Sequence, residues 1–280
     1  MKKINFPNLY SFILTHLQNH DIDDHDIEAS ILLNYFISEK KIIKDTKLSV
    51  SNQSFLLEII KKRALGFPIQ YITEEVNFYK SKFYVNENVL IPRPETEILI
   101  EKCIEFIRQN EIKNPNIIDI GTGSGSIAIS IAKEISDSRI YAVDISKDAI
   151  DVAKINANNN DVIINFVQGN LFANIDCKFD IVISNPPYIR TENIKNLQKE
   201  VLYEPVLALD GGIDGMSIIS KIINKGINKI SKHTPSGIFI EIDPQVLSPL
   251  EKILSALPSS LKYNITNDYS GYSRILSITT

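Results

Sequence analysis

The sequence predicts an α/β fold: a doubly wound, Rossmann-like sheet that follows an N-terminal helical bundle and a β-hairpin connector. Three observations predict it. Up to about Gly66, apolar residues recur at helical spacing. Residues 76–91 place apolar positions on both sides of a polar turn, which is typical of a hairpin. From residue 95 onward strand-like and helix-like segments alternate, and several strand-like segments are entirely apolar, as in a parallel sheet covered on both faces.

The N-terminal part is expected to be helical because each of its apolar groups fits one face of a helix. These groups lie around Leu9–Leu17, Ile27–Phe36 and Phe55–Ile60. Pro7 suits a first helical turn, and Gly66 suits a helix C-terminus. We therefore expect a helical bundle over residues 1–75, the hairpin connector over 76–91 and the α/β domain over 92–280.

The α/β domain is predicted to contain alternating strands and helices with an antiparallel hairpin at one sheet edge. The expected strands are Ile117–Ile120, Arg139–Val143, Ile163–Val167, Phe179–Ser184, Gly237–Ile242, Tyr263–Thr266 and Ile275–Ile278. The expected helices cover 95–109, 126–136, 147–158, 214–232 and 247–256. Isoleucine, asparagine and lysine are used heavily throughout, so we interpret Asn156–Asn160 as a solvated helix end rather than a recognition tract.

Composition excludes several function classes. The 280 residues are 44% hydrophobic and 23% charged, with a net charge of −4, which is not the profile of a general nucleic-acid binder. Residues 1–91 carry 11 basic and 11 acidic side chains, so the net negative charge lies in the remainder. The two cysteines form no CxxC pair, the four histidines have no metal spacing, and no apolar run reaches the roughly 18 residues of a membrane span. We expect a cytoplasmic protein without a metal or a membrane anchor.

A glycine-rich turn marks the first half of a candidate site. Asp119 lies in a predicted strand that runs into Gly121-Thr122-Gly123-Ser124-Gly125 and then an apolar helix, the order that cradles a polar or anionic ligand. Ser126 stands where a dinucleotide fingerprint has Gly or Ala, and no P-loop lysine follows. Asp144 ends the next strand, where a carboxylate can accept from both ribose hydroxyls; the alternative is a cap for the helix that starts near Ser146. Asp119 could meet a ligand ammonium group.

The second half of the site is Asn185-Pro186-Pro187-Tyr188, after an apolar strand. The two prolines fix φ and leave rigid carbonyl acceptors, the asparagine oxygen adds another acceptor, and the tyrosine adds a flat face. This set suits a planar NH2 group, because acceptors can hold both hydrogens while the ring packs on the plane. The alternative is a simple turn, which Asn-Pro-Pro also favours.

Together these residues resemble the class I S-adenosylmethionine-dependent methyltransferases that act on planar nitrogens. Further segments resemble one branch, the release factor glutamine methyltransferases. They are Arg63 with Gly66–Tyr71, Leu90–Glu97 (LIPRPETE), Tyr203-Glu204-Pro205 with Ala208–Gly215, and Asp268 with Gly271 and Arg274. This chain departs from the family pattern at Asn170, where many relatives have an acidic residue, and at Asp243, where glycine is usual.

The resemblance implies that S-adenosylmethionine is the cofactor and that the glutamine of the Gly-Gly-Gln motif of peptide-chain release factors 1 and 2 is the methyl acceptor. It implies that Gly121–Gly125, Asp144, Asn170, Leu171 and Asn185 contact the cofactor, and that Asn185–Tyr188 bind the substrate glutamine, with Asn185, Pro186 and Tyr188 in the catalytic step. The N-terminal helices are expected to dock the partner. We expect a monomer without stable nucleic-acid binding.

Other interpretations of the sequence stay open. Arg93 with Glu95 and Glu97 predicts a structural ion-pair corner that fixes domain orientation, rather than direct substrate contact. The Asn185 segment would equally suit glutamine methylation of a ribosomal protein, or amino-group methylation of a nucleic-acid base. A nicotinamide-dependent oxidoreductase fits the fold, although the glycine spacing disfavours it, and a non-enzymatic adaptor fits least.

Overall fold

The computed structural model describes residues 8–20, 22–42, 48–173, 175–232 and 234–280, and the chain divides into two compact units. The first unit contains the described residues up to Glu74 together with Gln198–Tyr203. The second contains Glu75–Leu197 and Glu204–Thr280. Pro7, the expected start of the first helix, lies outside the described residues.

The first unit is helical, as the apolar spacing predicts. Its elements are α1 (Leu9–Gln18), α2 (His25–Glu39), α3 (Val50–Ala64), α4 (Ile69–Thr73) and the short η3 (Val201–Tyr203). The residues at spacing of four on α1, Leu9, Ile13 and Leu17, are all buried, and they join side chains from α2 and α3 in one apolar core.

The segment Gln198–Tyr203, which follows much later in the chain, also belongs to this helical unit. Arg63 on α3 is only 2% exposed, and its Nη2 donates to Glu28 Oε1 at 2.8 Å and to Glu200 Oε1 at 2.6 Å. The rings of Phe67 and Tyr203 pack edge to face with centroids 5.1 Å apart. Nothing in the local sequence indicated this placement, because the Arg63–Glu200 pair spans 137 residues.

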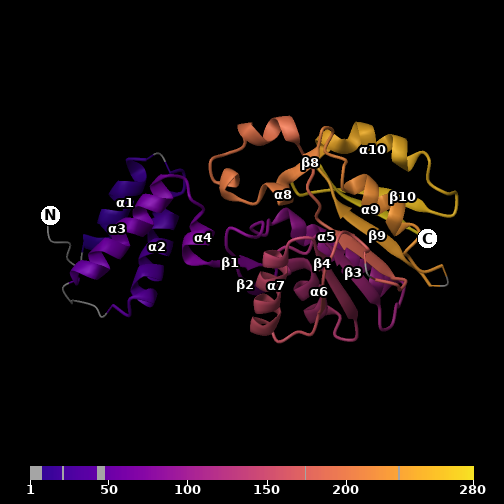
Figure 1. Cartoon of the computed structure of the whole chain (residues 1–280), viewed down its shortest axis with the longest axis horizontal. Coiled ribbons are helices and arrows are strands. Elements are labelled where there is room, and N and C mark those ends of the chain that lie inside the picture. Colours follow the sequence, from indigo (N-terminus) through magenta and orange to yellow (C-terminus); the bar gives the residue numbers. More distant parts are fainter. Residues whose placement is uncertain (1–7, 21, 43–47, 174, 233) are drawn as a thin grey trace. The chain divides into compact units, whose positions relative to one another are not determined.

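The second unit is built on a seven-stranded sheet with the order β10-β11-β9-β6-β3-β4-β5 (Figure 1). The strands are β3 (Asn116–Ile120), β4 (Arg139–Asp144), β5 (Asn165–Gln168), β6 (Ile181–Ser184), β9 (Gly237–Glu241), β10 (Lys262–Asn267) and β11 (Ser273–Thr279). From β5 to β9 neighbouring strands are parallel, whereas β11 is antiparallel to both β9 and β10. The predicted doubly wound α/β fold and its antiparallel edge hairpin are confirmed.

Helices cover both faces of this sheet, so it has two apolar cores (Figure 1). The helices are α5 (Glu95–Gln109), α6 (Ser126–Glu134), α7 (Lys147–Asn159), α9 (Ile219–Gly226) and α10 (Leu247–Leu254). Neighbouring strand residues alternate between the cores: Ile117 faces the core with α5 and α6, and Ile118 faces the core with α9 and α10. This explains strands such as β6, in which all four residues are buried.

Several smaller elements complete the second unit. They are the antiparallel hairpin of β1 (Glu75–Phe78) and β2 (Ser81–Tyr84), the parallel pair β7 (Ile189–Arg190) and β8 (Asp210–Gly212), η2 (Thr191–Asn196), α8 (Val206–Leu209) and η4 (Pro244–Val246). The hairpin is shorter than the predicted connector. No helix among the described residues is long and apolar enough to cross a membrane.

Two expectations from the sequence are wrong. The helix predicted over 214–232 covers only Ile219–Gly226, because Gly215 at φ +78° makes a turn before it and Ile230 forms a bridge with Phe179 after it. Asn156 is not solvated but 0% exposed. Its Oδ1 accepts from the Tyr84 amide at 2.6 Å, and its Nδ2 donates to the carbonyls of Tyr84 at 2.9 Å and Ser124 at 2.8 Å.

Candidate active site

A cavity of about 240 Å³ opens at the carboxyl ends of β3, β4 and β6, where open α/β sheets bind ligands. It brings together most of the residues predicted for the site. Gly121, Thr122, Gly123, Ser124, Asp144, Asn170, Leu171, Asn185, Pro186 and Pro187 all line it. Asp119, Gly125 and Tyr188 are not part of the lining.

The glycine turn connects β3 to α6 in a backbone conformation that side chains disfavour. Gly121 and Gly123 have φ of +72° and +54°, with open space where a Cβ would stand, so a ligand can approach this backbone closely. Gly125 has a different role. A Cβ there would lie 3.1 Å from the Cβ of Ala153 on α7, so this glycine lets α6 and α7 pack together.

Asp144 ends β4 and presents its carboxylate to the cavity. Oδ2 accepts from the Gly123 amide and Oδ1 from the Ser146 amide, both at 2.9 Å. The alternative of a helix cap is not supported, since Ser146 caps α7 with its own Oγ, which accepts from Ala149. Burial raises the pKa of Asp144, while the backbone N–H groups act in the opposite direction. A ligand that donates hydrogen bonds would stabilise its ionised form.

Asp119 is fully buried beneath the turn rather than exposed to the cavity. Its Oδ2 accepts from Thr122 Oγ1 at 2.7 Å. Burial raises its pKa to about 7, the hydrogen bond from Thr122 lowers it, and the charge of Asp144 raises it. In this position Asp119 holds Thr122, which does line the cavity.

Asn185 follows β6 directly, and its amide is anchored from outside the strand. Its Nδ2 donates to Thr96 Oγ1, at the start of α5, at 3.0 Å. Pro186 and Pro187 continue along the cavity wall. The segment therefore combines a fixed side-chain amide with two residues that lack an N–H donor, as the sequence indicated.

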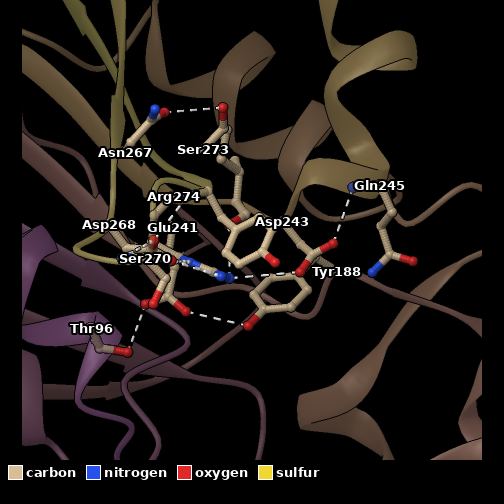
Figure 2. Close-up of polar contacts among 12 residues, drawn as sticks. Thr96, Tyr188, Glu241, Asp243, Gln245, Asn267, Asp268, Ser270, Ser273 and Arg274 are labelled. Atoms are coloured by element: carbon tan, nitrogen blue, oxygen red, sulfur yellow. Dashed lines mark hydrogen bonds and ion pairs between the residues drawn. The ribbon is translucent and has the colours of Figure 1, made fainter.

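Tyr188 is anchored by a buried carboxylate at the end of β9. Its hydroxyl donates to Glu241 Oε1 at 3.3 Å, while Thr96 Oγ1 donates to Glu241 Oε2 at 2.6 Å (Figure 2). Burial raises the pKa of Tyr188 well above its ordinary value. Glu241 is 1% exposed, and burial raises its pKa to about 7 against the hydrogen bond from Thr96 and the charge of Arg274, which lower it.

Two glycines lie against the backbone of Tyr188. A Cβ on Gly211 would lie 2.7 Å from Tyr188 Cα, and one on Gly215 would lie 2.4 Å from the Tyr188 carbonyl oxygen. The pairing of β7 with β8 brings this glycine loop beside the residues that follow Tyr188. The loop thus closes on the candidate substrate segment more tightly than any other residue type would allow.

Asp243, which stands where the family usually has glycine, needs no glycine conformation. Its φ of −119° and ψ of 149° are ordinary extended values. Its Oδ1 accepts from the Gln245 amide at 3.0 Å, and its Oδ2 lies 3.6 Å from Arg274 Nη1. Arg274 also pairs with Asp268 at 3.1 Å, so Asp243 is a second carboxylate beside the same guanidinium group (Figure 2).

The predicted ion pair at Arg93 is present, with a different partner. Arg93 Nη2 pairs with Glu204, whose other oxygen accepts from the Ile91 amide at 3.0 Å. Glu97 instead accepts from the Tyr79 amide at 2.8 Å. All of these groups belong to the second unit, so the Arg93–Glu204 pair stabilises the segment that precedes the N-terminus of α5 within that unit.

Sequence reasoning missed the functional position of Thr96 and Glu241. Thr96 lies in the LIPRPETE segment, but a threonine in a first helical turn is unremarkable by itself. Glu241 had a weak signal, since it is the one charged residue of the strand Gly237–Glu241. Within the described ranges, no cluster of three or more His, Cys, Asp or Glu side chains could hold a metal ion.

Known proteins share sequence or fold with this chain. A family model described as "Methyltransferase small domain" matches residues 96–212. A release factor glutamine methyltransferase of Flavobacterium psychrophilum is 36% identical over 91% of this chain and 93% of its own length. One from Clostridium acetobutylicum is 40% identical over 75% of this chain and 76% of its own length. The solved hMettl16 catalytic domain, in complex with an RNA hairpin, is 14% identical with a TM-score of 0.54, over 87% of this chain and 91% of its own, and shows a common fold.

Proposed function

The chain belongs to the release factor glutamine methyltransferase family, and on that basis we propose that it methylates the side-chain amide nitrogen of the glutamine in the Gly-Gly-Gln motif of release factors, with S-adenosylmethionine as cofactor. One observation carries the proposal. The glycine turn, the Asp144 carboxylate and the Asn185-Pro186-Pro187 segment line a single cavity, which supports a cofactor half-site beside an amide-binding half-site.

The cavity wall fits S-adenosylmethionine. We assign the ribose hydroxyls to Asp144, because its carboxylate lies in the lining and is already oriented by two backbone N–H groups. Gly121–Ser124 would approach the amino-acid part, with Asp119 acting through Thr122. Asn170 and Leu171 would contact adenine, and their place in the lining supports this. When bound, the cofactor supplies a methyl group activated by its sulfonium.

We assign the substrate amide to Asn185, Pro186, Pro187 and Tyr188. Asn185 Oδ1 and the proline-segment carbonyls are acceptors, and a primary amide has two N–H donors to offer them. Tyr188 is included because its backbone directly follows the lining residues, while its hydroxyl is held by Glu241 outside the lining.

The residue types suit a reaction limited by positioning. An amide nitrogen is a poor nucleophile because its lone pair is delocalised. Holding it in line with the methyl group can supply on the order of 7–11 kcal/mol of the barrier. Acceptors on the NH2 hydrogens also favour the positively charged, more pyramidal nitrogen of the transition state. Asn185 is therefore proposed to contribute mainly to turnover.

The proposed partner also needs a docking surface, and we propose the first unit for it. Its helices have their own apolar core, and none of its residues lines the cavity. Hydrogen exchange of the full chain should show protection in α1–α3 when a release factor is added. Protection confined to the second unit would contradict this assignment.

The function is tested with labelled S-adenosylmethionine, a purified release factor, the same factor with its motif glutamine replaced by alanine, a ribosomal protein mixture, and RNA. Label is expected on the intact release factor alone. Label on RNA or ribosomal protein, and none on the release factor, would overturn the proposal.

Asn185→Ala tests the assigned role of the amide. We expect a large fall in kcat with little change in cofactor affinity measured by calorimetry. Asn110→Ala, which truncates an exposed amide at the end of α5, is the matched control. Equal losses of turnover and cofactor affinity in Asn185→Ala would contradict the role.

A further inference from the structure

Glu241 contacts the candidate substrate segment directly through one carboxylate oxygen and indirectly, through Thr96, with the other. It is the last residue of β9 and is buried. Oε2 accepts from Thr96 Oγ1 at 2.6 Å, and Oε1 accepts from Tyr188 at 3.3 Å (Figure 2). Figure 2 shows Thr96 and Tyr188 reaching the carboxylate from different sides. Thr96 lines the cavity but Glu241 does not, so the carboxylate can influence a substrate there only through the residues it holds.

The hydrogen bonds have a direction that follows from the carboxylate. An ionised carboxylate only accepts, so Thr96 must give Glu241 its single hydroxyl proton. The Thr96 oxygen then has only lone pairs left, and the Asn185 group 3.0 Å away must be the NH2 rather than the carbonyl. This leaves Asn185 Oδ1 as the acceptor for the cavity, which Asn185 lines.

We propose that Glu241 is a positioning residue that acts through Thr96 to fix the Asn185 amide with its oxygen toward the substrate NH2. The inference rests on the proposed function, because an acceptor is needed there only if the substrate presents an amide NH2. With the amide reversed, the NH2 of Asn185 would face the NH2 of the substrate, and two donors cannot pair.

The charge of Glu241 is set by groups from several elements. Arg274 on β11 favours the ionised form, and so do the hydrogen bonds from Thr96 and Tyr188, while Glu95 on α5 opposes it. Asp243 and Asp268 share the charge of Arg274. With burial as the largest influence, the pKa of Glu241 rises to about 7. A protonated Glu241 could donate to Thr96, and the order of donors and acceptors would no longer be fixed.

The test compares Thr96→Val, which removes the hydroxyl at nearly constant shape, with Thr96→Ser, which keeps it. Ser130→Ala is the control, since Ser130 Oγ is buried without a hydrogen-bond partner among the described residues. At saturating cofactor and release factor, Thr96→Val should lower kcat on the order of 10²-fold, the effect of losing one oriented polar group at a reacting centre. Thr96→Ser should recover most of that loss. Release-factor affinity, measured by calorimetry with S-adenosylhomocysteine bound, should fall in Thr96→Val, while affinity for the cofactor should stay near that of wild type.

The pH profile separates positioning from simple packing. In wild type, kcat should fall below a midpoint near pH 7, because Glu241 becomes protonated. Glu241→Gln can keep its Oε1 on Thr96 and does not titrate, so its kcat should be independent of pH over roughly pH 6 to 8. An unchanged acid limb in Glu241→Gln, or wild-type kcat in Thr96→Val, would overturn the inference alone. A wild-type protein that methylates no release factor would overturn the proposed function, and the inference with it.

Discussion

Gly215→Ala tests whether the glycine loop determines where the candidate substrate segment lies. The added Cβ would lie 2.4 Å from the Tyr188 carbonyl oxygen and 2.9 Å from Val246 Cγ1, whereas ordinary contacts begin at 3.4 Å. The Tyr188 backbone would have to move by about 1 Å, and a displacement of that size can cost on the order of 10²-fold in rate. That loss corresponds to about 2.7 kcal/mol of transition-state stabilisation.

The conformational strain of the substitution must be separated from the contact. Gly215 has a φ of +78°, and an alanine in this region costs about 1–2 kcal/mol wherever it occurs. Gly271 offers a matched control, because its φ is +86° and nothing lies within 4 Å of its Cβ position. Gly271→Ala should therefore lose only the free energy of unfolding that the strained φ costs, and it should keep its rate.

The assay measures kcat with a release factor at saturating cofactor, cofactor affinity by calorimetry, and thermal unfolding of each variant. We expect Gly215→Ala to lose about two orders of magnitude in kcat and to bind the cofactor normally, since the glycine turn and Asp144 lie on other segments. Wild-type kcat in Gly215→Ala would refute the reasoning, and so would an equal loss in Gly271→Ala.

Three further predictions concern the rest of the second unit. Asp144→Asn should weaken cofactor affinity about 10–100-fold with kcat retained at saturation, because hydrogen bonds to a charged acceptor are lost; unchanged affinity in a titration would contradict the ribose assignment. Asn156→Leu should lower the free energy of unfolding, measured by urea denaturation, by at least about 3 kcal/mol, because buried backbone groups of Tyr84 and Ser124 lose their hydrogen-bond partner. An unchanged free energy of unfolding would show that those groups find other partners. For Asp119, the folded pKa of about 7 lies above the ordinary 3.8, so between these values the unfolded chain is ionised while the folded chain keeps its proton. As pH rises through this window, the free energy of unfolding of wild type should fall relative to that of Asp119→Asn by up to about 1.4 kcal/mol per pH unit. Parallel curves of unfolding free energy against pH would contradict a raised pKa of Asp119 in the folded chain.

The elements that the sequence predicted well are those defined by local periodicity. All seven strands of the central sheet were expected, since a run such as Ile181–Ser184, bounded by polar residues, has few alternatives. The glycine turn was predicted equally well, because glycine adopts its three positive φ values without the steric strain that other residues have there. The proline pair after β6 restricts its own backbone in the same local way.

The sequence did not predict the hydrogen bonds and ion pairs between polar groups that lie far apart in the chain. Asn156 was expected at a solvated helix end, because nothing local shows that two carbonyls and an amide need its side chain. The Thr96–Glu241 contact spans 145 residues, and Arg63–Glu200 spans 137. A polar residue looks the same in sequence whether water or a buried partner satisfies it, so these positions become visible only in the folded structure.

Two segments that carry the family resemblance, Leu90–Glu97 and Ala208–Gly215, act together with the end of β9 on the Asn185–Tyr188 segment. Thr96, in the LIPRPETE segment, holds the Asn185 side chain. Glu241, at the end of β9, holds the hydroxyl of Tyr188, and Gly215 closes on the backbone of that residue. Three segments, distant from one another in sequence, thus fix the side chain, the hydroxyl and the main chain of one four-residue segment. A reaction that depends on placing a weak nucleophile has this requirement, because an error of about 1 Å at the acceptor costs as much as the loss of a polar group.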